Sequence, residues 1–80
     1  MAGLVLWFNS NDHLPPHFHA ERSGEWAVRV SFLEHPEAMV EVIYSARRNR
    51  PSRADLKELT ELAAANRLAL LREWEAKVIV

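Results

Sequence analysis

The spacing of apolar residues changes once along the chain, near Ser52, and this change restricts the fold more than any other feature. Before it, residues 26–32 alternate large apolar with small or polar side chains, which is typical of a half-buried strand. After it, apolar residues recur at helical spacing, at Leu56, Leu59, Leu62, Ala63, Leu70 and Trp74. Ser52 and Asp55 form a capping-box pattern at the boundary. We therefore predict a sheet first and then a helix that covers it.

Turn-forming residues divide the first half into four strands, at about residues 4–9, 17–22, 26–32 and 39–44, and the helix is expected at about residues 53–76. In the last strand, Val40, Val42 and Tyr44 are expected to share one face, with Glu41 on the other. Eighty residues suffice for one small domain. The predicted fold is a single α+β domain over residues 1–80, with a three- or four-stranded antiparallel sheet packed by one long C-terminal helix.

The loop between the second and third strands decides where the histidines point. A two-residue loop would turn His17 and His19 into the core. A three-residue loop over residues 22–24, with Gly24 in the left-handed conformation, instead pairs apolar residues with each other. We predict this odd loop, which pairs Ala20 with Trp26 and Phe18 with Val28. One polar patch then collects His17, His19, Glu21, Ala27, Arg29 and Ser31.

Composition excludes several kinds of chemistry. The chain has no cysteine, so it has no disulfide, thiolate zinc site or cysteine nucleophile. Ten basic and eleven acidic residues give a net charge of −1, and a pI near 6.4 argues against a protein dedicated to coating nucleic acid. The apolar run over residues 2–8 is too short for a membrane span or a signal peptide. We expect a soluble, cytoplasmic protein without a membrane contact.

The histidines are the main functional signal. His17 and His19 lie two apart on a predicted strand, so they share a face, and His13 can approach from the preceding loop. One interpretation is a metal site, in which His13, His17 and His19 bind zinc or another divalent transition metal and Asp12 or Glu21 adds a carboxylate. A second is catalysis, in which His17 and His19 exchange acid and base roles on a phosphodiester held by Arg29. The third is a purely structural role.

Two further groups of residues are candidates for ligand binding. Residues 45–53 hold four arginines, including Arg47, Arg48 and Arg50, whose guanidinium groups suit phosphate contacts with RNA or DNA. The same loop could dock an acidic protein or serve only as a charged linker. Asn66 and Arg67 interrupt the apolar stripe of the helix. They either face a ligand, or the Arg67 stem packs and its head reaches water.

Residues 11–21, Asn-Asp-His-Leu-Pro-Pro-His-Phe-His-Ala-Glu, resemble the signature of a bacterial family known as domain of unknown function 4160. The glycine turn at Ser23 and Gly24 and the helix ending at residues 70–75 also resemble that family. The resemblance implies a small α+β domain whose gene commonly lies beside that of a second small protein, as in toxin–antitoxin pairs. This chain departs from the family at Leu62, where a tryptophan is common, and at Asn66, where a histidine is common. Since asparagine does not titrate, the second departure weakens the catalytic interpretation.

The leading functional hypothesis is therefore a component of a toxin–antitoxin-like module that engages RNA or another phosphate-bearing ligand through its histidine-rich strand face. Cleavage of that ligand stays open, so the chain is not assigned as an enzyme. The alternatives are a non-catalytic protein-interaction module and a mononuclear metal-binding domain. A small partner protein encoded nearby and a homodimer are both expected partners.

Overall fold

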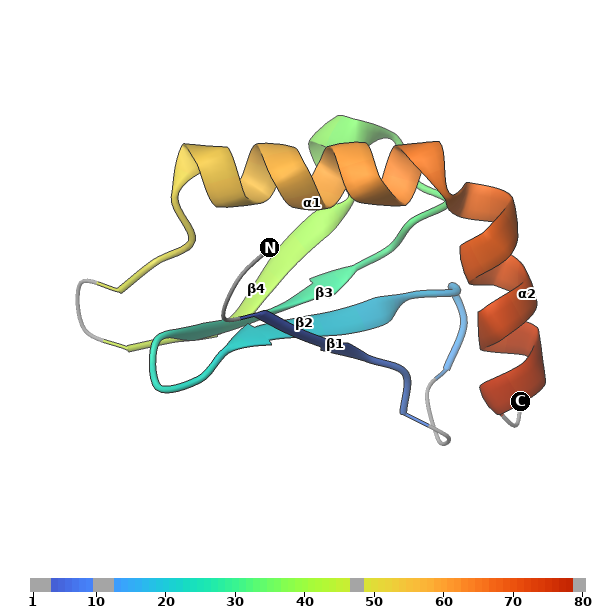
Figure 1. The fold of residues 1–80 in the computed structure, drawn as a ribbon, viewed down its shortest axis with the longest axis horizontal. Helices are drawn as coiled ribbons and strands as arrows, with labels where there is room; N and C mark the ends of the chain where they lie inside the picture. Colours follow the sequence, from blue (N-terminus) through green and yellow to red (C-terminus); the bar gives the residue numbers. More distant parts are fainter. Residues whose placement is uncertain (1–3, 10–12, 47–48, 79–80) are drawn as a thin grey trace.

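The structure is a computed structural model that describes residues 4–9, 13–46 and 49–78. Four strands precede two helices (Figure 1), which confirms the predicted α+β class. A single 3₁₀ turn, η1, separates the third and fourth strands. The elements are β1 (Leu4–Trp7), β2 (Phe18–Arg22), β3 (Trp26–Val30), η1 (Pro36–Ala38), β4 (Val40–Ser45), α1 (Arg53–Ala65) and α2 (Arg67–Lys77).

The strands form one antiparallel sheet in the order β1-β2-β3-β4, so each strand pairs with its neighbours in sequence. β1 and β4 are therefore the two edges among the described strands. Such a meander needs only short connections, which suits a chain of this length. Each edge strand hydrogen-bonds to the sheet on one side, and none of the described strands pairs with its other side.

The hairpin between β2 and β3 has the predicted odd loop but a different register. Arg22 faces Trp26, Ala20 faces Val28 and Phe18 faces Val30, so the loop covers residues 23–25 and not 22–24. Because both loops have three residues, every side chain keeps its predicted face. Gly24 has φ 76°, as predicted. The observed register brings the Arg22 guanidinium to 6.0 Å from the centre of the Trp26 ring. The predicted register matched apolar residues with each other, and such matching does not include a contact between an arginine and an aromatic ring.

A second correction concerns β4. A bulge at this strand pairs Val28 with Val42 but Ala27 with Tyr44, so that Ile43 is an extra residue. The bulge moves Tyr44 off the face of Val42 and onto the opposite face. Strict alternation, on which the prediction relied, fails wherever one strand contains an additional residue.

The core lies between the sheet and the helices. Phe18, Trp26 and Val28 from the sheet are buried against Leu59 of α1 and Trp74 of α2. The Phe18 and Phe32 rings stack with centroids 6.3 Å apart. The predicted helix stripe is thus largely confirmed, with one exception: Leu62 is 40% exposed.

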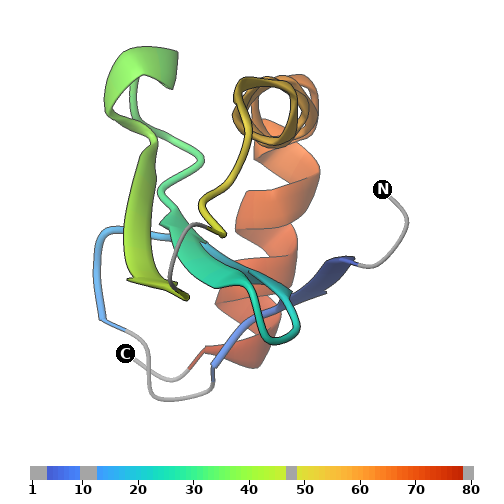
Figure 2. The same cartoon turned by 90° about the vertical axis from the view of Figure 1, so that its left-hand side faces the viewer.

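The predicted single helix is two helices that meet at Asn66. This residue has non-helical angles, φ −124° and ψ 22°, and its side-chain Nδ2 donates to the Leu62 carbonyl at 2.8 Å. Asparagine commonly competes in this way for backbone hydrogen-bonding groups and so disfavours a continuous helix. α1 lies across one side of the sheet, and α2 turns away to pack at the end where β1 stops and β2 starts (Figures 1 and 2). Neither is long and apolar enough to span a bilayer.

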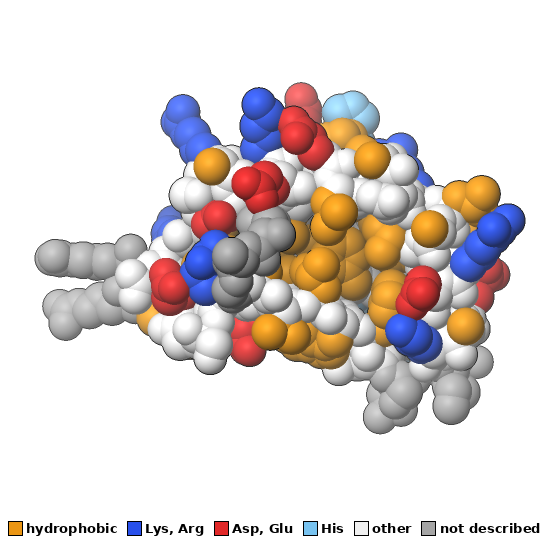
Figure 3. Space-filling model, in the orientation of Figure 1, with side chains coloured by type: hydrophobic (Ala, Val, Ile, Leu, Met, Phe, Trp, Pro, Cys, Tyr) orange, Lys and Arg blue, Asp and Glu red, His pale blue; other side chains and the backbone are white. Residues whose placement is uncertain are grey.

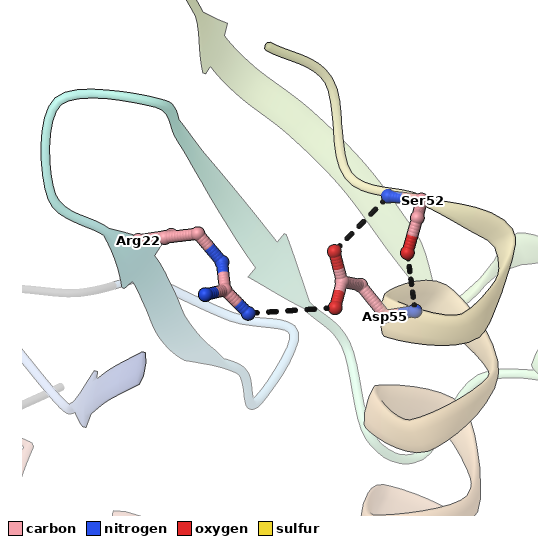
Figure 4. Close-up of polar contacts among 3 residues, drawn as sticks. All are labelled: Arg22, Ser52 and Asp55. Atoms are coloured by element: carbon pink, nitrogen blue, oxygen red, sulfur yellow. Dashed lines mark hydrogen bonds and ion pairs between the residues drawn. The ribbon is translucent and has the colours of Figure 1, made fainter. Parts of the chain in front are cut away.

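A capping box starts α1 and also ties it to the sheet (Figure 4). Ser52 Oγ accepts from the Asp55 backbone N–H at 3.0 Å, and Asp55 Oδ2 accepts from the Ser52 backbone N–H at 3.1 Å. The second oxygen of Asp55 lies 3.6 Å from the Arg22 guanidinium. Residues far apart in sequence therefore fix where α1 begins over the β2–β3 hairpin.

Candidate functional site

The helices cover one face of the sheet, and the opposite face, here called the outer face, carries no layer among the described residues (Figure 2). Strand register defines its members, because directly paired residues point to the same side. β1 and β2 contribute four side chains, and β3 and β4 contribute four more. The outer face consists of Val5, Trp7, His19, Glu21, Ala27, Arg29, Glu41 and Tyr44.

His17 precedes β2 and is buried, with only 3% of its surface exposed. Its Nδ1 lies 2.8 Å from the Pro15 carbonyl oxygen. A carbonyl only accepts, so Nδ1 carries the proton and donates it. Pro15 itself follows a cis peptide bond. His17 thus holds the proline-rich segment against the end of the sheet.

His19 is held by β1 and the residues after it. Its ring stacks on the Trp7 ring with centroids 5.4 Å apart, and its Nε2 lies 3.2 Å from Asn9 Nδ2. Trp7 Nε1 donates to Asn9 Oδ1 at 3.0 Å, which orients the Asn9 amide so that Nδ2 donates to His19. His19 Nε2 is then an acceptor without a proton.

Trp7, Asn9, His17 and His19, here called the histidine cluster, form one packed unit. The two imidazoles meet edge to face, with centroids 5.0 Å apart. This arrangement is typical of packed aromatic rings. The described residues contain no group of three histidine or acidic side chains that could hold a metal ion. His13 is exposed in the loop, and Asp12, the carboxylate considered as a further ligand, lies outside the described residues.

The basic residues of the predicted site are dispersed. Arg29 pairs with His19 on the neighbouring strand, and its guanidinium forms an ion pair with Glu41 of β4. The predicted loop over residues 22–24 would have paired Arg29 with His17, but both loops place Arg29 on the face of His19. Arg50 is exposed ahead of α1. Arg47 and Arg48 lie outside the described residues. A convergence of these arginines with the histidines therefore stays a prediction.

Asn66 and Arg67 sit on the helix side of the sheet. Asn66 lines a hollow together with Leu4 and Leu6 of β1. These two leucines alternate along β1 with the outer-face residues and therefore point to the helix side of the sheet. Asn66 thus does not join the histidines. The Arg67 guanidinium donates to the Glu34 carbonyl at 3.1 Å. Its Nε is buried with no partner among the described residues. One of the two predictions for Arg67 was a packed stem with the guanidinium in water. The stem is packed, but the guanidinium donates to the backbone carbonyl of Glu34.

Sequence reasoning missed two members of the histidine cluster, Trp7 and Asn9. Trp7 appeared only as part of an apolar strand, and Asn9 only as a turn residue. A signal existed for Trp7, because the register of the antiparallel β1–β2 pair decides whether its side chain lies on the same face of the sheet as His19. No local signal identified Asn9, since its amide acts between two side chains that become neighbours only through the fold.

Fold and site together define a small α+β domain in which none of the described helices or strands covers one face of the sheet, with a packed histidine cluster at the edge of that face. A family model for a domain of unknown function (DUF4160) matches residues 3–75, nearly the whole chain. The chain therefore belongs to this family, as the proline- and histidine-rich segment indicated. A comparison with curated proteins found no match, and a comparison with solved structures found none.

Proposed function

We propose that the protein is a non-catalytic binding module that docks a basic protein partner on its outer face. The observation that carries the proposal is the composition of this uncovered face. Val5 is 56% and Tyr44 48% exposed, although both lie on sheet strands. They lie on the two edge strands, at the ends of one row across the sheet in which Glu21 and Ala27 are the middle members. Exposed apolar side chains on an uncovered face are typical of interaction sites. Glu21 and Glu41 place two acidic groups beside them, against one arginine.

The charge of the outer face favours a protein over a nucleic acid. RNA binding depends on Lys and Arg that neutralise phosphates. The one arginine of this face, Arg29, is already paired with Glu41. Glu41 is engaged in the same ion pair, which leaves Glu21 as the carboxylate of this face that forms no ion pair among the described residues, and a basic protein surface gains from it. The family resemblance suggests where such a partner is found, namely the small protein encoded beside the gene.

The contacts of the histidines support a structural role in this module. His17 donates to a carbonyl in a buried position, and His19 is stacked and accepts from Asn9. These contacts fix the shape of the outer face at the β1–β2 end. Under this proposal the histidines stabilise the docking surface and transfer no protons.

Co-expression with the neighbouring gene's product tests the proposal. We expect the two chains to co-elute in size-exclusion chromatography, and Tyr44→Ala to reduce the complex while Leu68→Ala, at an exposed position on α2, leaves it intact. A parallel gel-shift assay at low salt with total RNA addresses the phosphate hypothesis. Absence of a complex, or an RNA shift lost in the Tyr44→Ala variant, would overturn the docking function.

A further inference from the structure

Two surfaces that the described elements leave uncovered differ in chemistry. Figure 3 shows hydrophobic side chains gathered in a hollow on the helix side of the sheet, whose lining is mainly apolar. Glu58, Glu61 and Glu73 in this lining are exposed, and Glu73 also pairs with Lys77 at 2.8 Å. Glu21 on the outer face is half-buried and has no ion pair among the described residues. A basic group therefore gains more at Glu21 than at a fully hydrated carboxylate.

Glu21 lacks a counter-ion although an arginine lies nearby. Arg29 pairs with His19 on β2, so it is a diagonal neighbour of Glu21, at a distance of about 7–8 Å that long side chains can span. The Arg29 guanidinium instead forms its ion pair with Glu41, which lies directly opposite on β4. The one arginine of the outer face thus satisfies Glu41 and leaves Glu21 unpaired.

The bulge in β4 brings an aromatic ring into the same row as Glu21. Ala27 pairs with Glu21 on one side and, because Ile43 is an extra residue, with Tyr44 on the other. Without the bulge, regular pairing would place Ile43 opposite Ala27 and Tyr44 on the helix side of the sheet. Bulges often occur beside functional sites, where they re-aim a side chain. The row across β2, β3 and β4 is therefore a carboxylate, the short side chain of Ala27 and the ring of Tyr44, which is 48% exposed.

We propose that Glu21, Ala27 and Tyr44, here called the arginine seat, bind one arginine side chain of the protein partner, an inference that rests on the docking function proposed above. The short Ala27 side chain leaves space over the sheet between the other two. Neighbouring strands lie about 4.8 Å apart, so a guanidinium above Ala27 is about 5 Å from each flanking strand. A cation within about 6 Å of a ring centre is attracted to the face of the ring. The guanidinium therefore reaches the Tyr44 ring and the Glu21 carboxylate together.

This pair of contacts favours arginine over lysine. A guanidinium is planar, so one of its faces can lie on an aromatic ring while its N–H groups donate to both oxygens of a carboxylate. The ammonium of lysine is a compact, strongly hydrated charge that offers no flat surface. The same row disfavours RNA and DNA, because their phosphates would approach the unpaired Glu21.

NMR tests the arginine seat without the partner protein. Tyr44 is the only tyrosine of the chain, so its ring signals report on this position alone. We expect acetyl-arginine amide to shift these signals progressively, and acetyl-citrulline amide, its uncharged analogue, to shift them much less. Glu21→Gln should reduce the arginine-induced shift severalfold, whereas Glu75→Gln, at an exposed position on α2, should leave it intact. Equal shifts with the two compounds, or a shift that Glu21→Gln does not reduce, overturn the inference.

Ala27→Leu tests the space above the sheet. The larger side chain fills the arginine seat but keeps Glu21 and Tyr44, so we expect the dissociation constant of the complex with the neighbouring gene's product to rise about tenfold. Ala64→Leu, at an exposed position on α1, is the matched control and should change this constant less than about twofold. Circular dichroism verifies that both variants are folded. A complex that a folded Ala27→Leu variant forms equally tightly argues against the seat.

The two experiments separate this inference from the proposed function. A chain that binds acetyl-arginine amide at Tyr44 but forms no complex with the neighbouring gene's product contradicts only the docking function. A chain that forms the complex, with no arginine-induced shift at Tyr44 and no loss in Ala27→Leu, contradicts only the arginine seat.

Discussion

His17 and His19 are two residues apart, yet the fold gives them different surroundings. His17 is buried and donates to the Pro15 carbonyl, whereas His19 lies on the outer face between Trp7 and Asn9. The sequence predicted that they share a side, and their rings do meet. It could not predict that Trp7 and Asn9 complete the cluster, because these contacts depend on the β1–β2 register.

His17→Ala tests the structural role of the buried imidazole. We expect a loss of about 2 kcal/mol in the free energy of unfolding, because the variant leaves a cavity and removes the donor to Pro15. Urea denaturation followed by circular dichroism measures it. His13→Ala is the control, since His13 is exposed and should change the stability little. Equal stability of the His17 variant and the unsubstituted chain would contradict the structural interpretation.

At the scale of elements, most of the fold was predictable from apolar spacing. The four strands and the start of α1 lie within about two residues of their predicted bounds, because alternation and the capping box are local signals. The bulge at Ile43 and the helix break at Asn66 were not predicted. In both places the backbone of a single residue departs from regular strand or helix geometry. The spacing of apolar residues along the sequence does not reveal such a departure.

The capping box offers a test of element stability. Ser52→Ala removes the acceptor for the Asp55 N–H and should reduce the free energy of unfolding by about 1 kcal/mol. Thermal or urea unfolding measures this loss. Glu75→Ala, at an exposed position within α2, serves as the reference substitution. If Ser52→Ala were no more destabilising than this reference, the capping box would not contribute to the start of α1.

For the whole molecule, the arrangement of layers is the decisive property. Helices cover only one face and leave both edges of the sheet open among the described strands. Two short helices cannot enclose a four-stranded sheet. The side chains of the surfaces that these helices leave uncovered determine what binds there. The outer face suits a basic protein.

The central claim is that the acidic, apolar outer face binds a basic protein and not RNA. The most direct measurement is isothermal titration calorimetry with the protein encoded beside the gene, for the unsubstituted chain, Glu21→Lys and Glu75→Lys. Both substitutions change the net charge equally, but only Glu21 lies on the outer face. We predict that Glu21→Lys raises the dissociation constant about tenfold, while Glu75→Lys changes it less than about twofold. Equal constants for the two variants, or tighter RNA binding by Glu21→Lys with no protein complex at all, would contradict the account.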